Sequence, residues 1–129
     1  MKRDLDQIRS ILFEMESSRY NHFQERLALN GILERGTDSE IGRANQIRAE
    51  HVRWMLDDGL LSLVKGCDNY VRVSAKGCDF LDVVRDEGIW QRTKRQVAEV
   101  GGSATIEFVK ALAVGFLRKQ VEQRTGLDL

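Results

Sequence analysis

The sequence predicts a mainly α-helical domain with a small β-hairpin, arranged as a winged helix-turn-helix with additional C-terminal helices. Three observations support this prediction. Apolar residues recur at helical spacing over most of the chain. Proline, the strongest helix breaker, is absent. A helical segment that ends at Gly59 is followed at once by two short strand-like runs joined by turn residues, which is the order of a recognition helix and its wing.

The first predicted helix covers residues 2–17. Its apolar positions recur at three- and four-residue steps, as expected for a stripe that faces a core, and they are Leu5, Ile8, Leu12 and Met15. Asp4 lies in the first turn, where a negative charge suits the helix dipole. Ser17 and Ser18 are predicted to end this helix.

Residues 20–36 can be interpreted in two ways. Phe23, Leu27 and Leu29 alternate as in a strand, and Asn30-Gly31 is a hairpin signal, but a helix remains an alternative. Thr37 and Glu40 have the spacing of a capping box, which predicts a short helix that begins at Thr37.

The helix expected before the wing covers residues 45–58, with Asn45 as its N-cap and Gly59 at its end. Its core-facing residues are predicted to be Ile47, Val52, Met55 and Leu56. An apolar run at 60–64, a turn at 65–69 and a strand at 70–73 then form the predicted wing.

Three helices are predicted to follow the wing. Ser74 caps the first, and its buried residues are Cys78, Phe80, Leu81 and Val84. The second covers residues 88–100, with a stripe of Trp90, Thr93, Val97 and Val100. Ser103 caps the last, and its apolar side consists of Ile106, Val109, Ala113 and Phe116.

The 129 residues and 42% hydrophobic content suit one domain over residues 1–129, with a winged-helix core at 1–87 and a helical extension at 88–129. Neither a signal-peptide core nor a membrane-spanning stretch is evident, so we expect a cytoplasmic protein with reduced cysteines. Twenty basic residues balance twenty acidic ones. Binding to nucleic acid would therefore require a local basic patch.

Several segments resemble a family of small winged-helix proteins of unknown function, often encoded in prophages and bacterial genomes. Residues 1–9 (Met-Lys-Arg-Asp-Leu-Asp-Gln-Ile-Arg) are similar to its start, and residues 51–61 (His-Val-Arg-Trp-Met-Leu-Asp-Asp-Gly-Leu-Leu) to its helix before the wing. Residues 73–82 resemble its next helix start, and Arg85-Asp86 and Trp90 continue this match. Residues 101–103 and 108–112 resemble its C-terminal helix. The likeness is lost over residues 19–46. It implies no catalytic residue, and it favours a strand near residues 20–29.

If the protein reads DNA, the helix at 45–58 would enter the major groove. The candidate DNA-binding residues on it, just before it and on the wing are Arg43, Asn45, Gln46, Arg48, Arg53, Lys65 and Arg72. Glu50, Asp57 and Asp68 dilute this patch, since like charges repel phosphate. The hypothesis depends on arginines that are free to meet phosphate; arginines paired with acids would favour a docking role.

The sequence predicts no enzyme, cofactor or metal site. His51 and Glu50 are neighbours on a helix and point about 100° apart, so a structural hydrogen-bonding role is expected for His51. The spacing of Cys67, Cys78, His22 and His51 matches no zinc motif. The carboxylate pairs Asp57-Asp58 and Asp86-Glu87 are typical of solvated helix ends, and nucleotide-binding and hydrolase motifs are absent.

We therefore expect a prophage-type winged-helix protein that binds double-stranded DNA, as a transcriptional regulator, and dimerises through its C-terminal helices. The alternative is a protein-protein interaction module of phage origin that docks on a host or phage protein. Its motivation is the zero net charge.

Overall fold

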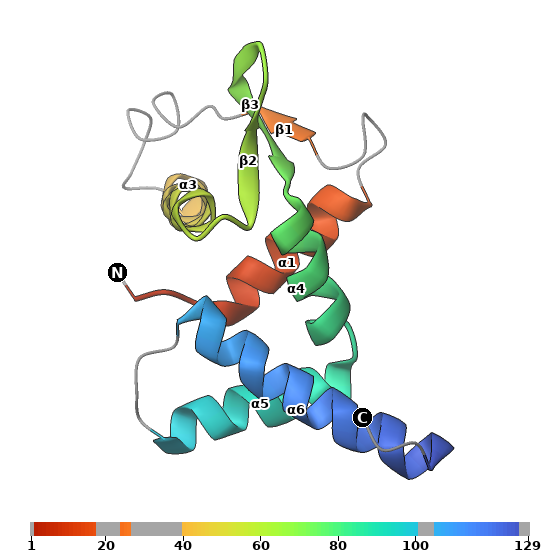
Figure 1. Ribbon diagram of the computed structural model, residues 1–129. Coiled ribbons are helices and arrows are strands. Elements are labelled where there is room, and N and C mark those ends of the chain that lie inside the picture. The colour runs from red at the N-terminus through yellow and green to blue at the C-terminus, as the bar shows by residue number, and fades with distance from the viewer. Residues whose placement is uncertain (1, 18–23, 27–39, 101–104, 127–129) are drawn as a thin grey trace. The chain divides into compact units, whose positions relative to one another are not determined.

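The computed structural model describes residues 2–17, 24–26, 40–100 and 105–126 (Figure 1). Within these ranges the chain forms five helices and three strands. In chain order they are α1 (Leu5–Glu16), β1 (Gln24–Arg26), α3 (Glu40–Asp57), β2 (Leu61–Val64), β3 (Cys67–Val73), α4 (Ala75–Val84), α5 (Glu87–Val100) and α6 (Ile106–Thr125). The predicted mainly helical fold with an antiparallel hairpin is confirmed.

The chain divides into two compact units, Met1–Cys78 and Asp79–Leu129, and the boundary falls inside α4. The first unit holds α1, α3 and all three strands, and the second holds α5 and α6. The prediction of one domain with a core at 1–87 and an extension at 88–129 stays a prediction.

The sheet of the first unit is antiparallel in the order β1-β3-β2, so that β3 is its central strand (Figure 1). Leu61 pairs with Val73, and Leu63 with Val71. Because paired residues share one face of a sheet, the buried side chains of Leu61, Val71 and Val73 lie on the same face. Arg72 lies on the other face and is exposed.

The wing has a shorter turn than predicted. The predicted turn at 65–69 is wrong at its second half, because β3 already begins at Cys67. Gly66 has a φ of +83°, the left-handed conformation in which glycine carries no steric cost. A two-residue turn can therefore close the hairpin, with a register shift between Leu63 and Val64.

The strand interpretation of residues 20–29 is confirmed at β1, where Gln24 pairs with Arg72 and Arg26 with Tyr70. The helical alternative is wrong for these three residues. The hairpin signal at Asn30-Gly31 and the cap at Thr37 lie outside the described residues.

The start of α1 is set by Asp4, which is its N-cap. The Asp4 carboxylate accepts hydrogen bonds from the backbone N–H groups of Asp6 at 2.9 Å and Gln7 at 3.4 Å, which satisfies donors that have no partner in the first turn. The helix ends at Ser17 as predicted. Its buried residues are Ile8, Ile11, Leu12 and Met15.

Helix α3 begins earlier than predicted. Asn45 is not its N-cap, because the helix starts at Glu40 and Asn45 lies within it. Between Glu40 and Asn45, Gly42 is the one residue with a low helix propensity. A single glycine inside a helix lowers its stability by only about 1 kcal/mol relative to alanine. Gly59 ends α3 as predicted, with a φ of +81°. The N–H groups of Gly59 and Leu60 bond to the carbonyls of Leu56 and Met55, which is the Schellman arrangement.

Ser74 connects the end of α3 to the start of α4. Its hydroxyl donates to the Gly59 carbonyl and accepts from the Gly77 N–H at 3.0 Å, which confirms its predicted capping role. A Cβ atom at Gly77 would lie 2.1 Å from the Leu60 carbonyl oxygen. Glycine at position 77 is therefore required for this close approach.

In the second unit, α5 and α6 contribute the buried residues Ile89, Trp90, Thr93, Ile106, Val109 and Ala113. The Thr93 hydroxyl donates to the Ile89 carbonyl at 2.7 Å. Val100 was predicted to be on the buried stripe of α5, but it is 56% exposed. Ile89, at the start of the helix, is buried instead, so the buried residues of α5 lie in its first half.

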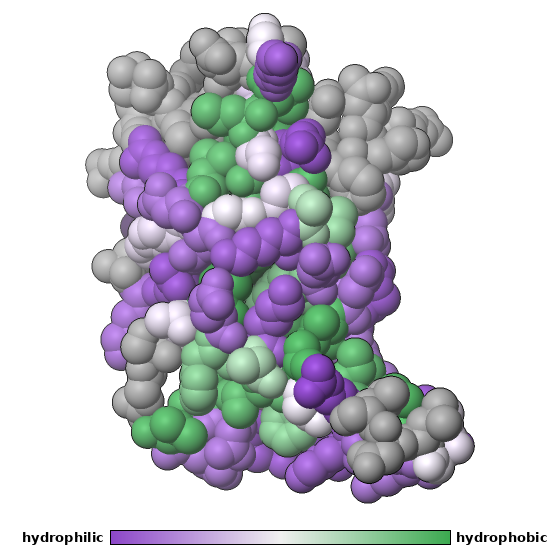
Figure 2. Space-filling model, in the orientation of Figure 1, coloured by the Kyte–Doolittle hydropathy of each residue, from purple (hydrophilic) through white to green (hydrophobic). Residues whose placement is uncertain are grey.

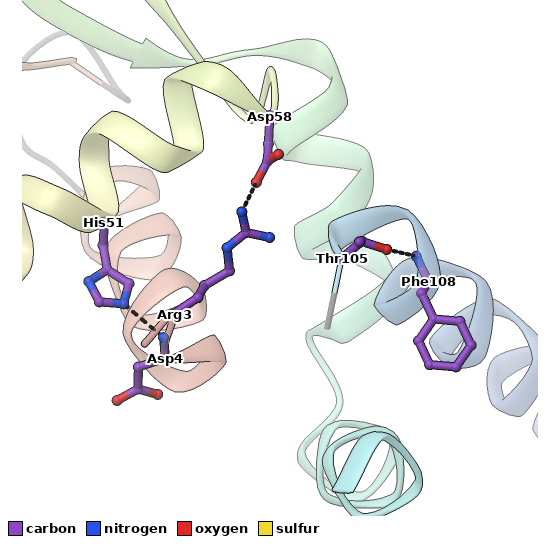
Figure 3. Close-up of polar contacts among 6 residues, drawn as sticks. All are labelled: Arg3, Asp4, His51, Asp58, Thr105 and Phe108. Carbon is purple, nitrogen blue, oxygen red and sulfur yellow. Dashed lines mark hydrogen bonds and ion pairs between the residues drawn. The ribbon is translucent and has the colours of Figure 1, made fainter. Parts of the chain in front are cut away.

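The N-cap of α6 also differs from the prediction. Thr105 caps this helix, and its hydroxyl accepts the Phe108 N–H at 3.2 Å (Figure 3). Ser103 was predicted in that role, but it lies outside the described residues and two positions before the observed cap. Both residues have the short hydroxyl side chain that capping needs, so the sequence pattern does not separate them.

Candidate nucleic-acid interface

Helix α3 has a buried face and an outward face. Ala49, Val52 and Met55 are at most 4% exposed. Since successive helical residues are about 100° apart, the opposite face carries five charged or amide residues of the helix together with two large apolar ones. They are Arg43, Gln46, Ile47, Glu50, Arg53, Trp54 and Asp57.

His51 fixes the edge of the buried face. It is 1% exposed, and its Nε2 accepts the Asp4 backbone N–H at 2.8 Å (Figure 3). Its Nδ1 lies 2.7 Å from the Ile47 carbonyl oxygen. Because a carbonyl oxygen only accepts, the proton is on Nδ1. Both ring nitrogens are thus used in structure, which confirms the role predicted for His51.

An ion pair holds the same N-terminal segment to the end of α3. A guanidinium nitrogen of Arg3 lies 3.5 Å from Asp58 Oδ2 (Figure 3). This oxygen is buried and makes no hydrogen bond within the described part of the chain, so the charge of Arg3 offsets its desolvation. Together with the His51 bond, the pair places residues 3 and 4 against α3.

The first half of α3, residues 40–47, presents unpartnered polar side chains. Arg43 and Asn45 are exposed, and Gln46 is half-buried. None of the three has a hydrogen bond or ion pair to a residue whose side chain the structure describes, which are residues 2–17, 43–66, 70–100 and 105–126. Arg43 and Gln46, three residues apart, lie on one side of the helix, and Asn45 points about 160° away from Arg43.

The second half of α3, residues 48–57, holds its arginines in ion pairs. Arg48 Nη1 lies 2.7 Å from a carboxylate oxygen of Glu14 on α1. Arg53 Nη1 lies 2.8 Å from a carboxylate oxygen of Glu50, one turn earlier on α3. Arg48 is therefore directed toward α1 and Arg53 toward its own helix. The DNA-binding hypothesis required arginines that are free to meet phosphate, and neither Arg48 nor Arg53 is free in this sense.

The two predicted wing residues lie apart from these pairs. Lys65 is exposed in the hairpin turn and has no partner within the described ranges. Arg72 is exposed on the outer face of the sheet, and its Nη1 donates to the Val73 carbonyl at 3.3 Å. Both cations can reach a ligand that contacts the wing.

Sequence reasoning missed three exposed apolar residues of the first unit. Ile47 was predicted to face the core but is 38% exposed, because it lies five residues, or about 140° of helix rotation, from Val52. Leu63 is 52% exposed and Tyr70 is 41% exposed. Figure 2 shows hydrophobic residues gathered over the sheet of this unit. The exposed Leu63 follows from its place beside the wing turn.

The carboxylate pairs have structural roles at helix ends. Asp58 pairs with Arg3, the Asp86 carboxylate accepts the Ile89 N–H at 2.9 Å, and Glu87 accepts from Gln91 at 2.7 Å. Among the residues that the structure describes, no group of three His, Cys, Asp or Glu side chains can hold a metal ion. Cys78 is a free, half-buried thiol. No described helix is long and apolar enough to cross a membrane.

Comparison with known proteins finds one family. A family model described as "Hypothetical protein (DUF2513)" matches residues 2–103, which is most of the chain. The matched region covers the whole first unit and continues through α5. No curated protein and no solved structure matches the chain.

Proposed function

The chain belongs to the DUF2513 family, and with this as the premise we propose that it is a winged-helix protein that binds duplex DNA. The first half of α3 would enter the major groove, and the wing would contact the flanking backbone. The protein has no catalytic role in this proposal, and a prophage origin and a cytoplasmic location stay predictions.

The order of the elements supports the winged-helix assignment. The first unit runs α1, β1, α3, β2 and β3, and its sheet has the order β1-β3-β2. In a winged helix-turn-helix, the helix directly before the hairpin is the recognition helix. That helix is α3, and Gly59 connects it to the hairpin without an intervening element.

The observation that carries the proposal is the pair of polar side chains at Arg43 and Gln46, which lie on one side of α3 and have no bond to any side chain that the structure describes. Recognition helices contact base edges with residues near their N-termini. Arginine can bind both acceptors of a guanine, and asparagine or glutamine can bind the acceptor and donor of an adenine. The exposed Arg43 and the half-buried Gln46, on the same side of α3, have the chemistry for a guanine and an adenine, and the exposed Asn45 would reach a different part of the groove wall.

Lys65 and Arg72 would supply the phosphate contacts. Phosphate neutralisation provides most nonspecific affinity for DNA and makes it sensitive to salt. Arg48 and Arg53 would contribute less to DNA binding than the sequence predicted, because each forms an ion pair with a carboxylate. We assign them to positioning α3.

Fluorescence anisotropy with a labelled duplex of random sequence at low salt tests this proposal. We expect salt-sensitive binding that is weakened about tenfold when Lys65→Ala and Arg72→Ala are combined, less by Arg43→Ala, and about twofold or less by Arg48→Ala. Arg95→Ala is the matched control, since Arg95 is an exposed arginine of α5. No binding at low salt, or an equal loss in the Arg95→Ala variant, would contradict DNA binding.

A second candidate is a protein-docking module. The observations that favour it are the exposed Ile47, Leu63 and Tyr70 and the ion pairs of Arg48 and Arg53, together with the zero net charge. Exposed apolar and aromatic side chains are common at protein interfaces. Pull-down after nuclease treatment, repeated with Leu63→Ser, separates the candidates. A partner that the wild type retains and Leu63→Ser loses supports docking.

We also propose a homodimer formed through the C-terminal helices. Half-buried apolar residues continue along α6 beyond its buried Ile106, Val109 and Ala113, and they are Val114, Phe116, Leu117 and Val121. Winged-helix dimers read two half-sites about 34 Å apart. Light scattering coupled to gel filtration gives the mass: twice the 14.8 kDa of one chain supports the dimer, and one chain mass contradicts it.

A further inference from the structure

The second unit contains a pocket that DNA binding does not use. It has a volume of about 360 Å³ and is lined by residues from the start of α5 and the end of α6. All of its lining residues belong to this unit. The volume is at the lower end of the range for small-molecule sites.

Two arginines give the pocket a positive charge. Arg92 of α5 and Arg124 of α6 both line it, and neither has a hydrogen bond or ion pair to a residue within the described ranges. Arg85 of the same unit, in contrast, is paired with Asp82 at 3.1 Å. Both arginines are exposed, and an anion bound in the pocket would interact favourably with both charges.

The remaining polar groups leave the positive charge in excess. Asp86 is the acid of the lining, and one of its carboxylate oxygens already accepts the Ile89 N–H at 2.9 Å. Gln120 and Gln123 add two amides, each with donors and an acceptor. The lining thus combines two guanidinium groups with amides that can bond to hydroxyl groups.

We propose that this pocket binds a small phosphomonoester, such as a sugar phosphate. Guanidinium groups bind phosphate oxygens in pairs of parallel hydrogen bonds, and two of them match a dianionic phosphate. The amides of Gln120 and Gln123 would face the hydroxyl groups of the organic part. A molecule the size of a pentose phosphate suits the volume.

Isothermal titration calorimetry on the full chain with ribose 5-phosphate, ribose and citrate tests the proposal. We expect binding of ribose 5-phosphate and none of ribose. Citrate should bind at least about tenfold more weakly, because its carboxylates are spread over a branched chain. Arg92→Gln and Arg124→Gln should each lower the affinity about tenfold, since each removes a charge-assisted hydrogen-bond pair.

Arg95→Gln and Arg118→Gln are the matched controls. They make the same change on exposed positions of the same two helices, and neither residue lines the pocket. Their affinity should stay within about twofold of the wild type. No binding of ribose 5-phosphate, tighter binding of citrate, or an equal loss in the controls would overturn the assignment. Circular dichroism of each variant verifies that the helices are intact.

Discussion

The two halves of α3 differ in what their polar side chains do. In the first half, Arg43, Asn45 and Gln46 have no partner among the described residues. In the second half, Arg48, Arg53 and His51 are each bonded to a carboxylate or a backbone group. One helix thus combines an unpartnered polar turn with a part fixed in the surrounding structure.

The difference shows that the position of an arginine on a helix does not reveal its role. Arg48 lies on the side of α3 that meets α1, where Glu14 is in reach. Arg43 lies five residues earlier, about 140° away around the helix axis. Burial has the same asymmetry, because Ala49, Val52 and Met55 all belong to the second half. We infer that the second half stabilises the unit and the first half is available for a ligand.

The largest expected effect concerns the buried face of the second half. Met55→Ala should lower the free energy of unfolding by about 2–5 kcal/mol, because Met55 is fully buried and its truncation leaves a cavity. Ile47→Ala, an apolar truncation in the first half, should change it by about 0.5 kcal/mol or less. Urea denaturation of both variants measures the difference. Equal losses would remove the distinction between the halves.

The next effect concerns His51. His51→Ala should lower the free energy of unfolding by about 1–3 kcal/mol, because the Asp4 N–H loses its acceptor at a part-buried position. Hydrogen exchange followed by NMR should show faster exchange at the Asp4 amide. The Asp6 amide, which donates to the Asp4 side chain, is the internal control. An unchanged rate at Asp4 would mean that His51 does not hold the N-terminal segment.

The buried stripes and caps of the first unit were largely predictable from the sequence. Ile8, Leu12 and Met15 repeat at helical spacing and are buried, and Ser74 caps α4 as its residue type suggests. Such features depend on a few neighbouring residues, so local periodicity and capping preferences are enough to find them. The sequence signal for β1 was weaker, because this strand is only three residues long.

The candidate site was less predictable, because its properties depend on residues that are distant in sequence. Nothing local to Arg48 indicates a bond to Glu14, which lies 34 positions earlier. The Arg53-Glu50 pair, at a spacing of three residues on one helix, was visible in principle. The pocket that contains Arg92 and Arg124 required the packing of α5 on α6, which no single-helix pattern reveals.

The third effect tests whether charge pairing limits DNA binding. Glu50→Gln releases Arg53 and removes a negative charge, so we expect duplex affinity to rise about three- to tenfold. The slope of the logarithm of the binding constant against the logarithm of the salt concentration should become steeper by about one. Asp57→Asn removes an exposed charge on the same face without releasing an arginine and should give a smaller increase. Fluorescence anisotropy over a range of salt concentrations measures both. Unchanged affinity in Glu50→Gln would favour docking over DNA binding.

The smallest effect concerns the Arg48–Glu14 pair. A double-mutant cycle with Arg48→Ala and Glu14→Ala should give a coupling free energy of about 0.2–1 kcal/mol, because the pair is partly solvated, with side chains 26% and 62% exposed. The coupling should fall as salt is raised, since mobile ions screen exposed charges. A coupling of zero at low salt would mean that Arg48 spends its time away from Glu14. Arg48 would then join Arg43 as an available cation, and the contrast between the two halves of α3 would hold for burial alone.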